Sequence, residues 1–407
     1  MRRGLRCLAW VLGMFFTLTD FPHASAQKIR FTPQRDIEST AAHCEELIRR
    51  FQGLPHKSRL VVLQDLPKYG PLAAGALPTL WEMYDFEVAE PELAARERAQ
   101  IIEVIAAVGI GDLQVFRSLA RVAKSNAHAK VRRAAVLGVS ELHFPVDSSY
   151  EFLQAFLDDK EELVREGALA GLTRLDVNWR TDQYVAKGIR QAVIAKCADP
   201  SAQVKAIAVE QAEKMFKFLR DPQDVIEALI PLLENEQTYQ TPVSNHHMGS
   251  RRISVAAAWA LSEIPDEAGA AAGKMLALAN SQSLSDDSQV QVIHAYVRLT
   301  QDKQMAADLL RPLLDSADSM PDFRIENLIQ EIGPGYDLYH PVLITWCRDD
   351  FASFRIIACD ALAGLREDAE PALAVLSKLA ENDEDEEVRT AAARAVSIIT
   401  KSLRDQK

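Results

Sequence analysis

One short pattern recurs along the chain: an Asp or Asn, four further residues, a bulky apolar residue, and then Arg or Lys. The apolar residues of its six clean copies are Val131, Val164, Val204, Phe323, Phe354 and Val388. Two degenerate copies are centred on Ile253 and Val290. Successive apolar residues are separated by 33, 40, 49, 37, 33, 31 and 34 residues. Self-similarity at a nearly constant step of this length predicts a repeat protein.

The residue types in each copy favour helices. Asp and Asn are preferred at helix N-caps, where the side-chain oxygen accepts a hydrogen bond from a free backbone N–H. Small residues at helical spacing, such as Ala134, Ala135 and Gly138, follow the pattern and allow a second helix to approach closely. Another apolar helical stretch precedes each copy, and no segment shows the sustained two-residue alternation of strands. The predicted unit is a helix, a short turn and a second helix.

Two helices per unit, an Asp before Val-Arg and alanine-rich second helices closely resemble HEAT repeats. The segments DEEVRTAAARAV and PSAQVKAIAVEQA carry this resemblance best, and it covers residues 70–405. It implies an all-α fold, a right-handed α-α superhelix of about 9 to 10 helical pairs. First helices would lie outside, and second helices would line a concave face. Residues 27–69 are predicted to form an N-terminal helical cap.

The resemblance also implies a structural role for the repeated charged residues. In HEAT repeats such residues form hydrogen bonds between neighbouring units as a ladder. A ladder is therefore expected here in preference to a catalytic role. The predicted ladder residues are Asn126, Arg132, Asp159, Arg165, Asp199, Lys205, Asp318, Arg324, Asp349, Arg355, Asp383 and Arg389.

Other polar positions on the second helices are predicted to face a partner. Charges of both signs alternate there, which suits a protein surface better than a small-molecule pocket with a mostly apolar lining. Trp259 is either a core residue or a contact anchor. The predicted protein-binding residues are Arg133, Glu166, Arg174, Glu210, Trp259, Asp360 and Arg394.

The longest step contains the segment NEQTYQTPVSNHHMGSRR, residues 235–252. Insertions in solenoids become loops, often on a binding face. His246 and His247 are candidate metal ligands in this loop, although two adjacent histidines are weak evidence by themselves. The alternative interpretation is a polar loop with two solvated histidines.

The first 26 residues are predicted to be a secretory signal peptide. They combine an arginine-rich start, an apolar stretch at 7–18 and a small-residue cleavage site before Gln27. The apolar stretch is shorter than the roughly 20 residues that a membrane span needs. The sequence thus predicts an exported, bacterial-type protein, periplasmic or secreted, with no transmembrane segment after cleavage. An uncleaved anchor is the alternative.

The net charge limits the classes of possible partner, and the cysteine spacing limits the possible metal sites. The segment 1–26 contains three of the 46 basic residues and one of the 58 acidic residues, so the mature chain has a net charge of −14. This argues against nucleic acid and anionic membranes as partners. Cys44, Cys197, Cys347 and Cys359 show no zinc-site spacing. Export would permit disulfides, but buried free thiols are expected for the last three.

Motifs for chemistry are not found. The sequence has no GxSxG elbow, no local Cys/His signature, no phosphate loop and no EF-hand loop. No catalytic residue and no cofactor are therefore predicted. The predicted function is an exported scaffold that presents a concave surface to a protein partner. The alternatives are a HEAT-like lyase-type enzyme, similar to phycobilin lyases, and a metal or small-ligand sensor that uses residues 235–252.

Overall fold

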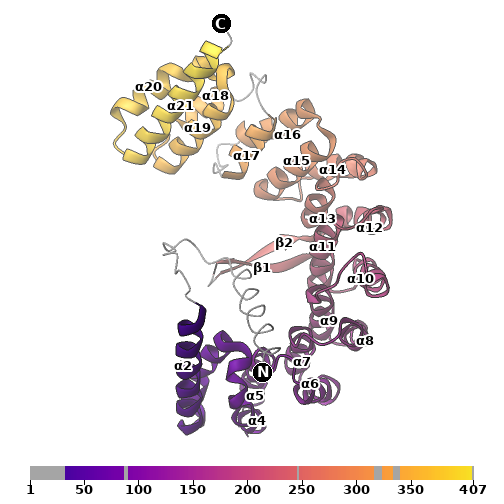
Figure 1. Cartoon of the computed structure of the whole chain (residues 1–407). Coiled ribbons are helices and arrows are strands. Elements are labelled where there is room, and N and C mark those ends of the chain that lie inside the picture. Colours follow the sequence, from indigo (N-terminus) through magenta and orange to yellow (C-terminus); the bar gives the residue numbers. More distant parts are fainter. Residues whose placement is uncertain (1–32, 87–89, 245–246, 316–322, 333–339, 406–407) are drawn as a thin grey trace.

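The structure, a computed structural model, describes residues 33–405 except 87–89, 245–246, 316–322 and 333–339. In this part of the chain, helices alternate between two rows along a curved path (Figure 1). The outer-row helices are α4 (Leu77–Asp85), α6 (Leu113–Ser125), α8 (Val146–Gln154), α10 (Gln183–Lys196), α12 (Gln223–Leu229), α14 (Ala272–Ala279), α16 (Lys303–Asp315), α18 (His340–Trp346) and α20 (Leu373–Asn382). The inner-row helices are α5 (Pro91–Val108), α7 (Ala129–Glu141), α9 (Glu162–Arg174), α11 (Ala202–Phe216), α13 (Ile253–Ser262), α15 (Asp286–Thr300), α17 (Phe323–Ile332), α19 (Ala352–Gly364) and α21 (Glu386–Asp405).

Consecutive outer and inner helices form nine pairs within the described residues, from α4–α5 to α20–α21. Segments of 3₁₀ helix extend several outer helices: η1 (Leu63–Ala76), η2 (Ile230–Glu234), η3 (Gly269–Ala271) and η4 (Arg366–Ala372). In Figure 1 the chain forms an arc, with α6, α8, α10 and α12 on its convex side and α7, α9, α11 and α13 towards its concave side. The predicted all-α solenoid is confirmed.

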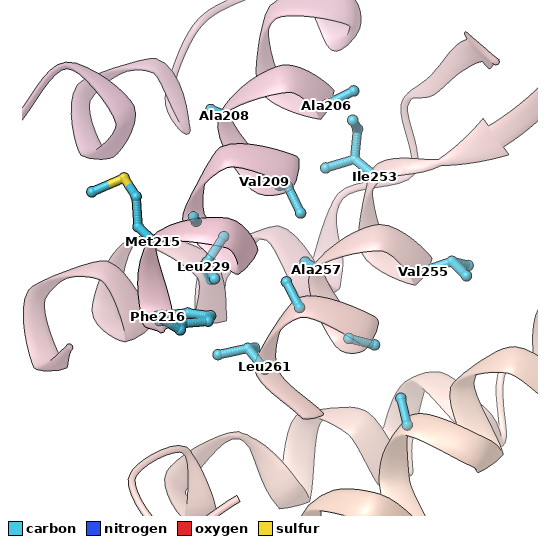
Figure 2. Packing of buried hydrophobic residues seen from close by; sticks show 14 of the residues in the cluster. Ala206, Ala208, Val209, Met215, Phe216, Leu229, Ile253, Val255, Ala257 and Leu261 are labelled. Carbon is cyan, nitrogen blue, oxygen red and sulfur yellow. The ribbon is translucent and has the colours of Figure 1, made fainter. Parts of the chain in front are cut away.

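A continuous hydrophobic core fills the space between the two rows. Figure 2 shows it where α11 contributes Met215 and Phe216, α12 contributes Leu229, and α13 contributes Ala257 and Leu261. Full burial of one large apolar side chain stabilises a fold by about 1.5–3 kcal/mol. Because each helical pair contacts mainly its neighbours, the stability of the solenoid is approximately the sum of such contacts along the chain.

Glycines bring adjacent helices close together, as the sequence predicts. A Cβ at Gly138 in α7 would lie 2.9 Å from the Cβ of Ala106 in α5. A Cβ at Gly171 in α9 would lie 3.0 Å from Cδ2 of Leu153 in α8. Both separations are shorter than normal carbon–carbon contacts, so a larger residue at either site requires the helices to move apart.

The predicted helix N-caps need a correction. Asp159 Oδ1 accepts a hydrogen bond from the backbone N–H of Glu161 at 2.9 Å, and Glu161 is the N-cap of α9. Asp349 Oδ1 accepts from the N–H of Phe351 at 2.9 Å, and Phe351 is the N-cap of α19. The acid thus closes a side-chain turn two residues before the cap. It orients the chain for helix entry without capping the helix.

The insertion at 235–252 contains a β-hairpin, whereas the sequence predicts a loop. Strand β1 (Thr238–Ser244) pairs antiparallel with β2 (His247–Arg252). The hairpin extends towards the concave side of the arc (Figure 1). Periodicity missed these strands because TYQTPVS and HMGSRR are polar at most positions, so no apolar face marks them.

The N-terminal end of the described chain adds α2 (Pro33–Gly53) and α3 (His56–Val62), which contact η1. The predicted signal peptide, residues 1–26, lies outside the described residues. Within the described ranges, no helix combines the length and the apolar character that a bilayer span requires.

The four cysteines of the described chain are buried free thiols. This agrees with the expectation for Cys197, Cys347 and Cys359. Burial raises the pKa of the Cys197 thiol to about 12. A hydrogen bond with Cys347, together with burial, raises the pKa of Cys359. Thiolates are therefore disfavoured at both positions at neutral pH.

Candidate functional site on the concave face

The repeated arginines join consecutive helical pairs. Arg165 donates from Nε and Nη2 to the two carboxylate oxygens of Asp199, each at 2.9 Å, and from Nη1 to the carbonyl oxygen of Asp159 at 3.0 Å. Arg132 reaches Asp159 at 3.2 Å, and its Nη1 donates to the carbonyl oxygen of Asn126 at 3.1 Å. Each arginine therefore ties its own entry turn to the acid of the next repeat.

The same arrangement returns near the C-terminus. Arg355 donates to Asp383 at 2.8 Å and to the carbonyl oxygen of Asp349 at 2.8 Å. Arg389 belongs to the last described pair and donates to the carbonyl oxygens of Asp383 and Glu384. The contacts of these arginines are thus with the framework of the solenoid.

Asp199 shows the electrostatics of this arrangement. Its side chain is only 2% exposed, and that of Arg165 is 11% exposed. Burial alone would raise the pKa of Asp199. Hydrogen bonds from Arg165 and from the Ser201 N–H, with the charges of Arg165 and Lys196, outweigh burial and lower this pKa. The carboxylate is therefore held in its charged form.

The ladder changes its chemistry around the hairpin. Lys205 Nζ donates to the amide oxygen of Gln237 at 2.6 Å instead of to a carboxylate. In the next repeat the expected position holds Ser254, and Arg252 takes over by donating to Ser283 Oγ at 3.0 Å. Arg324 forms an ion pair with Asp287 of the preceding repeat. The predicted partner position Asp318 lies outside the described residues.

Most predicted protein-binding residues pair with one another between neighbouring inner helices. Arg133 Nη2 lies 2.7 Å from Glu166 Oε1, and Arg394 pairs with Asp360. Arg174 lies 2.9 Å from Glu141. The partners are about one repeat apart in sequence, so stacking of the repeats brings them together. Their protein-binding role stays a prediction.

A cavity of about 260 Å³ lies where the hairpin covers α11 and α13. Two predicted residues, Glu210 of α11 and Trp259 of α13, line it. The hairpin adds Tyr239 and Arg251, which the sequence reasoning missed. Their residue types could have marked both positions as candidates for binding, but only the folding of the hairpin brings them over α11.

Side-chain contacts hold the hairpin in this position. The Gln203 amide of α11 donates to the carbonyl oxygen of Gln240 at 3.5 Å and accepts from the Gln240 N–H at 3.4 Å. Tyr239 lies opposite Arg251 in the strand register. Arg251 Nη2 donates to Gln291 Oε1 of α15 at 2.6 Å. The hairpin is thus fastened to two inner helices.

Trp259 packs against the hydrophobic core and also lines the cavity, so it combines both expected roles. The Arg298 guanidinium lies 5.1 Å from the centroid of its ring, a distance typical of cation–π contacts. His294 meets the ring edge to face, with centroids 5.4 Å apart. Arg298 also pairs with Glu263 at 2.9 Å. These contacts fix the indole as a rigid wall of the cavity.

Beside the cavity, the charged form of one carboxylate, Glu213, is disfavoured. Burial and the negative charges of Glu263 and Glu210 raise the pKa of Glu213. Glu210 already pairs with Lys214 at 2.6 Å. Burial likewise raises the pKa of Tyr239 and lowers that of His294. The site therefore offers hydrogen-bond donors and acceptors, an aromatic wall and a carboxylate that gains from a polar partner.

The two metal candidates from the sequence are His246 and His247. His246 lies outside the described residues, and for His247 only the place of the backbone in β2 is described. Across the described part of the chain, no three or more His, Cys, Asp or Glu side chains gather at a distance suited to one metal ion. The metal prediction stays untested.

A larger cavity of about 700 Å³ lies beside α10 and the turn after α11. Stacked Trp179 and Phe218 rings, 5.8 Å apart, form one wall. The basic residues in its lining are Arg180, Lys187, Arg190, Lys217 and Arg220. This surface suits anionic groups, and its lining comes from α10 and the turns beside it, apart from the inner helices and the hairpin.

Comparisons with known proteins agree with this architecture. The family model for HEAT repeats matches residues 340–406. No curated protein shows significant sequence similarity to the chain. Among solved structures, the chain is similar to Kap95p in its complex with RanGDP, with 12% identity and a TM-score of 0.55 over 90% of this chain and 50% of that one. It therefore spans half the length of Kap95p.

A second similarity is to a homology model of the full-length AP-3 complex, with 13% identity and a TM-score of 0.53 over 87% of this chain and 60% of that one. A weaker likeness is to the complex of CpcE and CpcF of phycocyanin lyase from Nostoc sp. PCC7120, with 22% identity and a TM-score of 0.31 over 42% of this chain and 98% of that one. A TM-score this low supports no inference about lyase chemistry. The chain therefore has the fold of a helical-repeat α-solenoid, and its residues 340–406 match the HEAT-repeat family.

Proposed function

We propose that this chain is an exported scaffold that holds a protein partner against its concave face. The observation that carries the proposal is the cavity formed by α11, α13 and the hairpin. A solenoid needs no inserted hairpin to complete its core, because the helical pairs already bury it. An insertion that builds a polar and aromatic site on the concave side is therefore best explained by recognition.

The size and lining of the cavity favour a protein ligand. Its volume of about 260 Å³ lies below the roughly 300–1,000 Å³ of typical small-molecule sites. It suits one side chain of a partner, with the surrounding inner helices making further contacts. Trp, Tyr and Arg are enriched in the energetic centres of protein interfaces, and all three residue types line this cavity.

The charged pairs on the preceding inner helices, α7 and α9, support the same interpretation. Arg133–Glu166 and Arg174–Glu141 place both signs of charge along the inner helices. Such mixed surfaces provide specificity through complementary charges. Solenoids of this type bind proteins, as the complex of Kap95p with RanGDP illustrates. We assign no catalytic role to the chain.

Export is part of the proposal and rests on residues 1–26. Mass spectrometry of the protein purified from its native cells should find an N-terminus at or near Gln27. A chain that retains Met1 in a cytosolic fraction would contradict export and leave the binding role to be judged separately.

Affinity capture with the tagged full chain tests the binding role. We expect one partner protein in stoichiometric amount. Glu210→Lys, inside the cavity, should reduce its recovery. Glu227→Lys, an identical charge change on exposed outer helix α12, should not. Equal recovery with both variants would show that the concave site is not the binding site.

A further inference from the structure

The two edges of the hairpin differ in what they offer to another strand. The N–H of Ile253 donates to the carbonyl oxygen of Gln237 at 3.0 Å, and Tyr239 lies opposite Arg251. In an antiparallel pair, the hydrogen-bonded positions alternate along each strand. The odd-numbered positions therefore bond across the hairpin. The backbone N–H and C=O groups of Gln240 and Ser250 face outward, away from the opposite strand.

The β1 edge is closed. Both outward groups of Gln240 are bonded to the side-chain amide of Gln203, at 3.4 and 3.5 Å. The next outward position in β1 is Pro242, which has no N–H to donate. Natural sheets use such devices to prevent pairing along an exposed edge.

The β2 edge is open. Ser250 is exposed, and its backbone has no hydrogen-bond partner on the outward side among the described residues. Among those same residues, Arg251 and Arg252 bond to neutral groups, Gln291 and Ser283, and to no carboxylate. The edge therefore offers main-chain hydrogen bonds beside two guanidinium charges.

A third guanidinium lies close to this edge. Arg324 of α17 pairs with Asp287. Burial, and then the positive charge of Arg251, lower the pKa of Arg324. Asp287 already supplies a carboxylate to Arg324, so Arg251 and Arg252 are the guanidinium groups of this edge that can pair with a partner's anion. The positive character is local, because the whole chain has a net charge of −12.

We propose that the open edge of β2 binds an extended, acidic segment of the partner protein as an added strand. Main-chain hydrogen bonds to Ser250 provide affinity, as in other complexes formed by strand addition. Alternate side chains of the added strand point to one face, where a carboxylate meets the guanidinium group of Arg251. This inference rests on the proposed scaffold function and specifies how the partner is held.

Peptide binding to the full chain tests the proposal. The probe is the fluorescein-labelled peptide Val-Glu-Val-Thr-Val-Glu-Val, and its control has Lys in place of Glu. We expect fluorescence anisotropy to show binding of the acidic peptide and at least about tenfold weaker binding of the basic one, with affinity falling as salt rises. Failure of the acidic peptide to bind at about 1 mM, or equal binding of both, overturns the proposal.

A proline variant locates the contact. Ser250→Pro removes the outward N–H of β2 without touching the bonds to β1, and should weaken peptide binding about tenfold or more. Ser250→Ala keeps that N–H and should leave binding unchanged. Amide exchange at Tyr239 and Arg251 verifies that the hairpin persists. Equal binding by Ser250→Pro and the wild type contradicts strand addition.

A variant with an intact backbone guards against misfolding. Arg251→Gln should weaken binding of the acidic peptide while Ser250 amide exchange still slows on binding. An unchanged affinity of Arg251→Gln for the acidic peptide would show that the charge of Arg251 does not contribute to binding. Sedimentation of the wild type tests a second copy as occupant: a dimer that Ser250→Pro dissociates would overturn the partner segment in favour of self-pairing. Partner capture that survives Ser250→Pro but not Glu210→Lys would keep the scaffold function and refute this inference.

Discussion

Two stretches of the solenoid join their repeats with different chemistry. From α7 to α11, Arg132 and Arg165 donate to the carboxylates of Asp159 and Asp199. From α11 to α15, Lys205 donates to the neutral Gln237, and Arg252 to Ser283. The helices on both sides pack on one continuous core. The framework therefore tolerates loss of the carboxylate as long as each buried donor keeps an acceptor.

The difference matters because a paired charge is not free for a partner. In the first stretch, framework carboxylates neutralise the arginines. In the second, Arg251 and Arg252 keep their charge beside an open strand edge. The proposed site for recognition thus coincides with the place where the repeat departs from its own pattern. The departures also include the longest step between copies, 49 residues.

The comparison predicts its largest effect for Arg165→Ala. The variant leaves the buried Asp199 carboxylate with Lys196, at 3.5 Å, as its remaining cation. Breaking a buried ion pair in this way should lower the free energy of unfolding by about 3 kcal/mol. Urea unfolding measures the loss, and hydrogen exchange should localise it to α9 and α11. A loss under about 0.5 kcal/mol, the usual range for surface changes, would contradict the framework role.

Lowering the pH should change the contributions of Asp199 and Glu213 to the free energy of unfolding in opposite directions. The folded-state pKa of Asp199 is lowered, so its stabilisation is present above about pH 4 and is lost as the pH falls through that pKa. The pKa of Glu213 is raised, so its unfavourable effect appears as the pH rises above about 4.3.

Urea unfolding at several pH values checks these signs. Glu213→Gln should remove a rise in stability on acidification from pH 7 towards the ordinary Glu range. Asp199→Asn should remove a fall below about pH 4. If either variant retains the wild-type pH dependence, the carboxylate in question is not its source.

A smaller effect is expected for Lys205→Ala at the joint beside the hairpin. This change removes a hydrogen bond to the neutral Gln237, which retains its contact with the carbonyl oxygen of Pro200. The cost should be about 1–1.5 kcal/mol, below that of Arg165→Ala. Chemical denaturation of the two variants in parallel makes the comparison. A larger loss for Lys205→Ala would show that the neutral joint is the more rigid one.

The smallest effect is expected for Arg174→Ala. Arg174 and Glu141 are 54% and 47% exposed, so their ion pair is screened by water. Its loss should cost under about 0.5 kcal/mol. Thermal unfolding should therefore barely change, and any loss of partner capture would reflect recognition. A clear loss of stability would place Arg174 with the framework arginines.

Much of the fold follows from local patterns. The spacing of Val131, Val164 and Val204 marks three inner helices, α7, α9 and α11, and each of these residues is buried. The small residues at Gly138 and Gly171 indicate close helix contacts, which the structure contains. Helix period and residue size are local properties, so a sequence records them directly.

The site depends on relations that local patterns lack. Tyr239 and Arg251 reach α11 because a polar hairpin folds back over it, and polar strands leave no apolar alternation. Arg133 and Glu166 look like independent surface charges until the repeats stack and bring them together. The exact turn is also decided by geometry, since Asp159 lies two residues before the helix cap.

The sequence by itself determined the repeat and its two helices, because these depend on spacing within about one repeat. The joining role of the arginines was implied by the resemblance to HEAT repeats. Only the tertiary structure decided which charges are neutralised, where Trp259 stands between core and cavity, and which edge of the hairpin stays open. Those outcomes depend on stacking across repeats and on which strand faces Gln203. Such contacts join residues about 30 to 40 positions apart, and their partners become visible only when the solenoid is assembled.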